Sequence, residues 1–301
     1  MNTEIKGNMQ TRKELDQIAN NDSVLHSYIF IGQDGIGKKE IAKEFAQKIL
    51  CQSKEKNCTC KSCICFIAEN HPDFQIINEE GTVIKIEQMR QMIQNVYEKP
   101  ILSEKKVYII NDSDKMTKEA QNSLLKTLEE PPDYASFILI ATNQDLILNT
   151  IKSRCTKIVF NNLTTNEIKE ILSQRGFKIS LSDKMINFFN GSIGKAIKIL
   201  ENKDIYIQVD KFIDSLMKQD KIDFFTNKEI FIKEYINEIL EYCIVSLFYE
   251  GKEKKDVRIL NCIKYVQETI NRIKSYCNFD MSIDYMLLKI WEEVNENNRR
   301  S

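Results

Sequence analysis

A glycine-rich segment at residues 32–39 has nearly the composition and spacing of a loop that binds nucleotide phosphates. In the pattern G-x-x-x-x-G-K-[ST], backbone N–H groups surround the phosphates, the lysine neutralises them and the final hydroxyl binds Mg²⁺. Lys39 stands in place of that hydroxyl, so the segment lacks an ordinary Mg²⁺ ligand. We predict a degenerate nucleotide-binding loop and leave open whether ATP still binds. The residues that could still hold an anion are Gly32, Gly35, Gly37 and Lys38.

A second position where ATPase chemistry needs acidic residues follows the apolar segment at 105–110. In a working ATPase such a strand ends in an aspartate that orients Mg²⁺, and a glutamate that activates water comes next. Asn111 and Asp112 stand at these two places. An amide carries no charge and a shorter carboxylate reaches less far, so both functions are weakened. An alternative role for Asp112 and Asp114 is to cap a helix that begins near Thr117.

Five of the nine cysteines lie between positions 51 and 65, which is the density of a metal site. A reducing cytosol disfavours disulfides, and four thiolates in a closed tetrahedron make a structural zinc site without an open position for water. Free structural cysteines or chance clustering are the alternatives. We favour Cys51, Cys58, Cys60 and Cys63 as ligands of Zn²⁺ and leave out Cys65, which begins an apolar segment. The distant cysteines lie among apolar residues and are assigned to the core: Cys155, Cys243, Cys262 and Cys277.

The elements around these residues alternate between strands and helices as far as residue 160. Apolar strands are predicted at 27–31, 105–110, 136–141 and 157–160, and a hairpin at 74–77 and 82–86. This order predicts a parallel α/β sheet with phosphates bound at its carboxyl edge. The remainder has helical periodicity throughout. We therefore expect an α/β domain at 1–161 with the zinc module at 51–65, a small helical lid at 162–204 and an all-helical collar at 205–301.

Apolar helix surface in the collar exceeds what one small bundle should need, notably at 230–248 and 259–273. We expect part of it to lie against sister subunits, and an ordinary bundle core is the rival explanation.

The overall charge argues for no particular partner. Lysine and arginine number 43 against 44 acidic residues, so the net charge of −1 indicates neither a nucleic-acid nor a membrane surface. No apolar run approaches the roughly 18 residues that span a bilayer, and residues 1–10 are polar. We expect a cytoplasmic protein.

An ordered series of motifs extends over the first 200 residues. The most specific are Leu-Leu-Lys-Thr-Leu-Glu-Glu-Pro at 124–131 and Ser-Arg-Cys at 153–155. Others are His26 to Phe30 before the loop, Leu50-Cys51, His71-Pro72-Asp73 and the segment 191–196, Gly-Ser-Ile-Gly-Lys-Ala. This series resembles the delta-prime subunit family of the bacterial DNA polymerase III clamp loader, within the AAA+ class. Residues 205–301 match only in length and helical character.

The resemblance implies a stator subunit that does not hydrolyse ATP. Active motor subunits carry a lid arginine that touches the terminal phosphate, and Gly194 with Lys195 occupies that region here. In this family the arginine of Ser-Arg-Cys, here Arg154, reaches in trans into the ATP site of a neighbouring subunit. Three family zinc ligands align with Cys51, Cys60 and Cys63, and the fourth falls one residue before Cys58.

The implied partners are the gamma/tau ATPase subunits, the delta subunit, the beta sliding clamp and primer-template DNA, within the DNA polymerase III holoenzyme. One alternative function is an active ATPase subunit of the same loader, which Lys39, Asn111 and Gly194 disfavour together. A zinc-ribbon protein that binds nucleic acid is a second alternative, and the neutral charge disfavours it.

Overall fold

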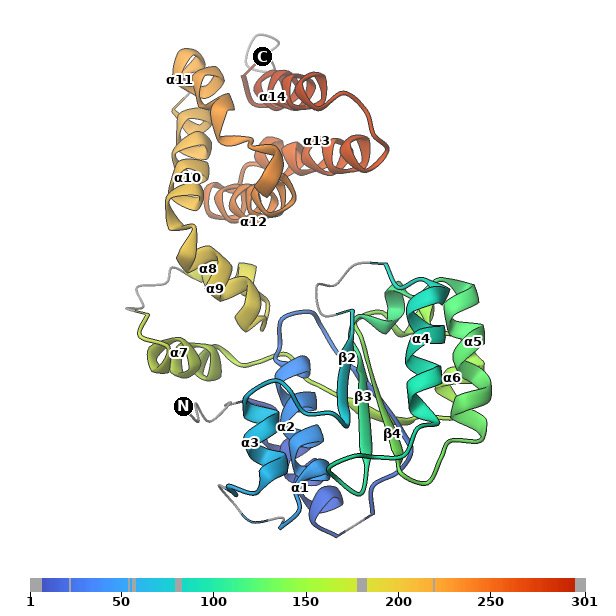
Figure 1. Ribbon diagram of the computed structural model, residues 1–301. Coiled ribbons are helices and arrows are strands. Elements are labelled where there is room, and N and C mark those ends of the chain that lie inside the picture. The colour runs from blue at the N-terminus through green and yellow to red at the C-terminus, as the bar shows by residue number, and fades with distance from the viewer. Residues whose placement is uncertain are drawn as a thin grey trace. The chain divides into compact units, whose positions relative to one another are not determined.

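The computed structural model describes residues 7–21, 23–53, 55, 58–78, 83–177, 183–218 and 220–295 (Figure 1). The chain forms two compact units. The first holds the described parts of Met1–Gly176 together with Gly191–Gly194, and the second holds those of Phe177–Asn190 and Lys195–Ser301. The division into base, lid and collar stays a prediction.

The first unit is built on a five-stranded sheet in the order β2-β3-β4-β1-β5. All four strand pairings are parallel, which confirms the predicted α/β class. The central strands are buried along their whole length, and this explains their unbroken apolar runs. The strands are β1 (Ser27–Ile31), β2 (Phe74–Ile77), β3 (Lys106–Ile110), β4 (Ala135–Ala141) and β5 (Thr156–Val159).

The predicted hairpin at 74–77 and 82–86 is wrong in its pairing. Among the described residues β2 pairs only with β3, and Ile84 instead forms a parallel bridge with Met116. The expected turn at residues 79–81, with residue 82 of the second expected strand, lies outside the described residues. Two adjacent apolar runs separated by a glycine resemble a hairpin in sequence, and only long-range pairing distinguishes them.

Helices cover both faces of this sheet (Figure 1). On one face α1 (Met9–Asn20) and α2 (Lys38–Leu50) pack on the strand side that carries Tyr28 and Phe30, with α3 (Lys61–Ile67) beside them. On the other face α4 (Ile86–Val96), α5 (Lys118–Glu129) and α6 (Asn149–Lys152) cover the side that carries Ile29 and Ile31. Short 3₁₀ turns η1 (Ser113–Lys115) and η2 (Gln144–Leu146) follow β3 and β4, and α7 (Thr165–Gln174) follows β5.

The turn His71-Pro72-Asp73 ties α3 to the sheet. The His71 imidazole Nε2 lies 2.9 Å from Ser62 Oγ on α3, and its Nδ1 accepts the Asp73 N–H at 3.1 Å. The buried Asp73 carboxylate accepts three backbone N–H groups at 2.7–2.8 Å, from Ile101, Leu102 and Ser103. Because Nδ1 of His71 is an acceptor and Asp73 bonds only to backbone, this trio is a structural anchor and not a hydrolase triad.

The second unit is entirely helical over its described residues. Helix α12 packs against α8, α10 and α13, and α13 packs against α14. Its helices are α8 (Asp183–Phe189), α9 (Ile193–Glu201) from Lys195 onward, α10 (Lys203–Met217), α11 (Lys221–Thr226), α12 (Ile236–Lys254), α13 (Val257–Lys274) and α14 (Phe279–Asn295), with 3₁₀ turns η3 (Asn227–Ile230) and η4 (Lys233–Tyr235). No described helix is long and apolar enough to cross a membrane.

Much of the apolar surface at 230–248 and 259–273 is buried inside this bundle, and burial of the remainder against sister subunits stays a prediction. Ile239, Leu240 and Leu247 of α12 are fully buried, as is Val266 of α13, because α10 and α14 cover the remaining faces. Phe248 stays half-exposed. The assignment of distant cysteines to the core is wrong for Cys277, which is exposed in the turn between α13 and α14.

The anchor at Asp73 yields a prediction for stability. In Asp73→Asn an amide N–H₂ faces backbone N–H donors, so at least one buried donor loses its acceptor. We expect the free energy of unfolding to fall by about 1–3 kcal/mol. Chemical denaturation measures it, with the exposed Asp133→Asn as matched control. Equal stability of the two variants would contradict the anchor.

Candidate phosphate loop, cysteine cluster and arginine site

The glycine-rich loop joins the carboxyl end of β1 to the start of α2, the place where phosphate loops lie. Gly35 and Gly37 have φ of 73° and 90°, in the left-handed region that favours glycine. Ile36 between them is buried in the core of the α/β unit and fixes the loop. The backbone thus keeps the outline of a phosphate cradle.

Lys38, the residue that should neutralise phosphates, is turned onto the loop itself. Its side chain is buried, and Nζ donates to the carbonyl oxygens of Gly32 and Gln33, both at 2.6 Å. Burial lowers the pKa of Lys38, and the nearby charges of Asp34 and Asp112 partly oppose that effect. The ammonium therefore neutralises groups of the chain itself.

The segment 191–194 lies directly against the loop. The N–H of Gly194 donates to the Gly35 carbonyl at 2.9 Å. A Cβ added at Gly194 would lie 3.0 Å from Gly35 Cα, and one added at Gly35 would lie 2.3 Å from Ser192 Oγ. A side chain at position 194 would therefore require the Gly35 backbone to shift by a few tenths of an ångström.

Asn111, at the position predicted for a metal-orienting aspartate, makes hydrogen bonds to Asn78 at the end of the neighbouring strand β2. Its Nδ2 donates to the Asn78 carbonyl at 3.3 Å, and Asn78 Nδ2 donates to the Asn111 carbonyl at 3.2 Å. Both residues are buried, and this reciprocal pair joins the ends of β2 and β3. The pair requires an amide N–H₂ at position 111, which a carboxylate cannot supply.

The acidic residues after Asn111 have structural partners, though not the predicted ones. Thr117 caps α5, so capping of that helix by Asp112 or Asp114 is wrong. Asp112 pairs with Lys115 at 2.9 Å. Asp114 accepts the N–H groups of Thr142 and Asn143 at 3.3 and 2.9 Å and so holds the turn after β4.

Four cysteine thiols gather at the start of α3. The Sγ atoms of Cys51, Cys58, Cys60 and Cys63 all lie within 4.8 Å of one another, and Cys65 is not in this group. A tetrahedron of thiolates about Zn²⁺ has Sγ atoms roughly 3.8 Å apart, so the arrangement fits the ion. These four cysteines could hold a metal.

Two of the sulfur atoms accept hydrogen bonds that stabilise the thiolate form, which is the form that binds a metal cation. Cys58 Sγ accepts from the Cys60 N–H at 3.2 Å and from Ser53 Oγ at 2.8 Å. Burial raises the pKa of Cys60, but N–H donors of Cys63 and Gln52 outweigh it and lower this pKa to about 6. Burial and the neighbouring Cys51 raise the pKa of Cys63. Thiols this close cannot all ionise without a cation between them.

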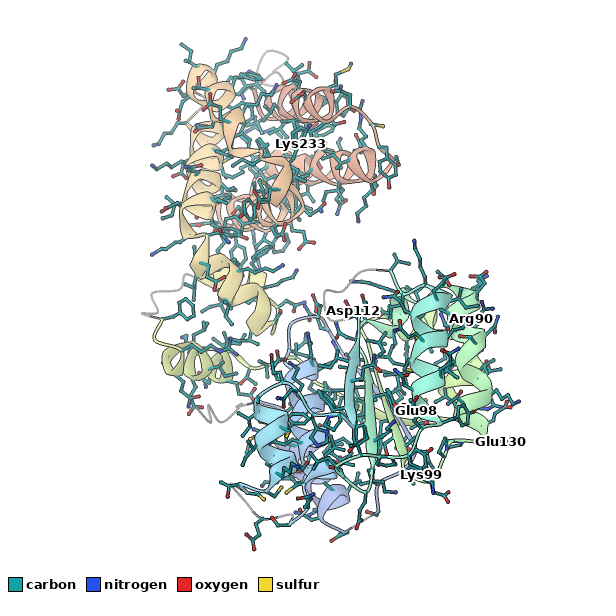
Figure 2. The ribbon with its side chains drawn as sticks, in the orientation of Figure 1. Arg90, Glu98, Lys99, Asp112, Glu130 and Lys233 are labelled. Atoms are coloured by element: carbon teal, nitrogen blue, oxygen red, sulfur yellow. The ribbon has the colours of Figure 1, made fainter. Side chains whose placement is uncertain are left out.

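Arg154 lies at the opposite edge of the sheet from the loop. It immediately precedes β5, and β5 begins beside the start of β1, whereas the loop follows the end of β1. Figure 2 labels one residue near each edge: Asp112, which follows β3, is near the loop, and Glu130, which follows α5, is near Arg154. The length of β1, five residues, separates these edges by roughly 16 Å.

The guanidinium of Arg154 is held by groups of its own unit. Nη2 bonds to Glu129 Oε1 at 2.5 Å, and Nη1 donates to the Thr150 carbonyl at 2.8 Å and to Ser153 Oγ at 3.3 Å. The sequence analysis singled out Arg154 but gave no separate role to Glu129, which it considered only as part of the motif at 124–131.

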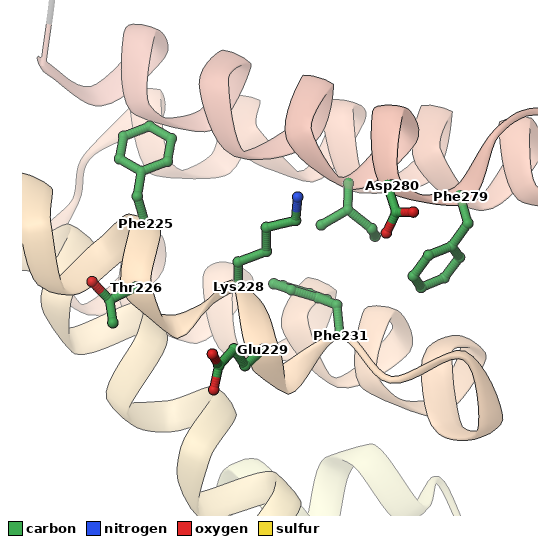
Figure 3. A pocket seen from close by; sticks show the side chains of 8 residues that line it. Phe225, Thr226, Lys228, Glu229, Phe231, Phe279 and Asp280 are labelled. Atoms are coloured by element: carbon green, nitrogen blue, oxygen red, sulfur yellow. The ribbon is translucent and has the colours of Figure 1, made fainter.

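A pocket of about 460 Å³ lies in the second unit, between η3 and α14 (Figure 3). Phe231 and Ile283 form its buried floor, and Lys228 and Asp280 are among the polar residues around it. It shares no residue with the loop, the cysteine cluster or Arg154.

Comparison with known proteins assigns this chain to a family. The model of the family described as "DNA polymerase III, delta subunit" matches residues 7–164, more than half of the chain. The delta' subunit of DNA polymerase III from Bacillus subtilis is 30% identical over 203 residues, covering 67% of this chain and 59% of that protein. The gamma subunit from Buchnera aphidicola of Acyrthosiphon pisum is 33% identical over 185 residues, covering 59% of this chain and 51% of that protein.

The aligned region thus spans little more than half the length of these relatives. Among solved structures, a DNA polymerase III gamma subunit-related protein from Thermotoga maritima superimposes with a TM-score of 0.57. That alignment covers 95% of this chain and 100% of the other at 18% identity, so it supports the fold alone.

The cysteine geometry yields a prediction that separates Cys58 from Cys65. Purified protein should carry about one zinc ion per chain, with Zn–S distances of about 2.3 Å by X-ray absorption. Cys58→Ser should weaken zinc retention against a chelator, because it removes one of the four gathered thiols, whereas Cys65→Ser should keep it. If Cys65→Ser weakens zinc retention and Cys58→Ser keeps it, the fourth ligand is Cys65 and not Cys58. Stoichiometric zinc in a Cys60→Ser/Cys63→Ser variant would refute the site.

Proposed function

Because the chain belongs to the DNA polymerase III delta-prime family of clamp-loader subunits, we propose that it is a stator that does not hydrolyse ATP. The observation that carries this proposal is the buried amide pair of Asn78 and Asn111. It occupies the position from which an acidic side chain would orient Mg²⁺. With Lys39 in place of the hydroxyl ligand, neither usual protein anchor for the metal is present.

The electrostatics of the loop support the same conclusion. A nucleoside triphosphate brings about four negative charges, and the Lys38 ammonium that should meet them is already bonded to two loop carbonyls. Asp34, Asp112 and Asp114 lie close enough to raise the pKa of that ammonium. An incoming phosphate would have to compete with these carboxylates and displace the bonds that Lys38 makes.

Arg154 is the residue that we propose takes part in chemistry, and it would do so at a neighbouring subunit's ATP. The strand length between the two sheet edges prevents its side chain from reaching the loop of its own chain. A planar fork of N–H donors suits the charge that develops on a transferring γ-phosphoryl group. The proposed neighbour is a gamma/tau ATPase subunit.

The proposed assembly also contains the delta subunit, and it would open the beta sliding clamp and place it on primer-template DNA. The cysteine cluster would hold a structural Zn²⁺ that fixes α3. The helical second unit would supply the collar contacts of the ring.

An active ATPase subunit is the second candidate, because several relatives of similar identity are named gamma or gamma/tau subunits. The bonds made by Lys38, Asn111 and Gly194 weigh against it, since each uses a group or space that nucleotide would need.

Restoring the missing residue types should not restore activity. We expect no ATP turnover above background in the isolated chain, and none in Lys39→Thr/Asn111→Asp, because a carboxylate at 111 would face the Asn78 carbonyl. Phosphate release with and without Mg²⁺ measures this, and a motor subunit is the positive control. Turnover in the natural chain that disappears on Lys38→Ala would establish the second candidate.

Removing the arginine tests the role in trans. An arginine finger contributes roughly 10³ to 10⁵ in rate at the site it serves. The loss for a complex with several ATP sites is smaller. Arg154→Ala should leave the chain folded and assembled but reduce DNA-stimulated ATP hydrolysis and clamp loading. Arg154→Lys should rescue little, because a point charge does not reproduce the fork.

The matched control is Lys157→Ala, which removes an exposed cation three residues away. A complex carrying Arg154→Ala that hydrolyses ATP and loads clamps as fast as this control would make Arg154 an ordinary surface residue.

A further inference from the structure

Glu129, the last residue of α5, makes the shortest of the described hydrogen bonds to the exposed Arg154. Its Oε1 lies 2.5 Å from Arg154 Nη2, and both side chains are partly exposed, at 48% and 33%. We propose that Glu129 is a positioning residue, which holds the Arg154 guanidinium ready for the ATP of a neighbouring subunit. This inference rests on the proposed function of Arg154.

The contacts of the guanidinium leave a defined part of it available. Nη1 uses two donors, on the Thr150 carbonyl and Ser153 Oγ, and Nη2 uses one, on Glu129. A guanidinium has five N–H donors, so three are used within the described residues and two remain. The chain therefore fixes the arginine and still leaves donors for phosphoryl oxygens.

The fold gains little from placing a carboxylate at position 129. A salt bridge between partly exposed side chains contributes little to stability. A negative charge in the last turn of a helix such as α5 also opposes the helix dipole, and Glu130 places a second one beside it. A residue whose charge is unfavourable at its place in a helix, and which adds little stability elsewhere, is a candidate for a functional role.

The proposed reaction explains what the contact does. At the neighbour's site a water oxygen bonds to the γ-phosphorus while the bond from phosphorus to the β–γ bridging oxygen breaks, giving ADP, hydrogen phosphate and a proton that passes to solvent. Arg154 neither gives nor takes a proton and only stabilises the charge. That contribution depends on prior placement, because an arginine side chain free to sample its rotamers must be ordered during the reaction.

The experiment compares two adjacent glutamates in the assembled loader. Glu129→Gln removes the charge that holds Arg154, and Glu130→Gln removes a neighbouring exposed charge that makes no hydrogen bond to Arg154 among the described residues. The readout is the Arg154-dependent rate, which is the DNA-stimulated ATP hydrolysis remaining after subtraction of the Arg154→Ala rate. Glu129→Gln should lower this rate about tenfold, within the range for misplaced catalytic groups, with KM and melting temperature unchanged.

The Arg154→Ala background separates positioning from a structural role. Glu129→Gln should have no further effect in Arg154→Ala, because its only consequence passes through the arginine. An equal loss in both backgrounds, a rate equal to that of Glu130→Gln, or a faster rate would each overturn the inference while leaving the proposed function standing. If Arg154→Ala itself has no effect, the proposed function fails and this inference fails with it.

Discussion

The common direction of the five strands is the constraint on which the rest of the first unit depends. β1 and β5 are parallel, with Tyr28 paired to Thr156. The segments that directly follow the strands therefore lie at the carboxyl ends of the sheet, called the carboxyl edge, and the segments that directly precede them lie at the amino edge. The glycine-rich loop and the Asn78–Asn111 pair share the carboxyl edge. Arg154 and Glu129 share the amino edge. A single subunit therefore presents two chemically different edges.

At the carboxyl edge, groups that resemble ATPase machinery satisfy hydrogen bonds of the fold. Lys38 bonds to loop carbonyls, Asn111 to a strand end and Asp114 to the turn after β4. Buried polar groups need partners, and each partner found within the chain is one that a ligand must displace. The same residues stabilise the unit and, in the proposed stator, would oppose nucleotide binding, so the two effects would have one physical origin.

The sequence contained enough information for the elements whose signal is local. Unbroken apolar runs predicted β1, β3 and β4, and close spacing singled out the four gathered cysteines. It was wrong where long-range pairing decides, as in the supposed hairpin, and it left open whether Leu240 and Val266 lie in a bundle core, where they are buried, or against another subunit. Glu129 and Asn78 were missed for the same reason, since each is an ordinary residue until folding brings its partner, 25 or 33 positions away, into contact.

The contact between Gly35 and Gly194 shows why a loop can keep its glycines without a need for nucleotide. A side chain at either position would meet the other segment, at 2.3 Å from Ser192 Oγ or 3.0 Å from Gly35 Cα. Glycine is therefore required there by packing, whether or not phosphates bind. The usual inference from a glycine-rich pattern to phosphate binding has two premises, close backbone approach and a ligand to be approached. Here the backbone of Gly194 makes the close approach, with its N–H donating to the Gly35 carbonyl, so the glycines alone do not establish nucleotide binding.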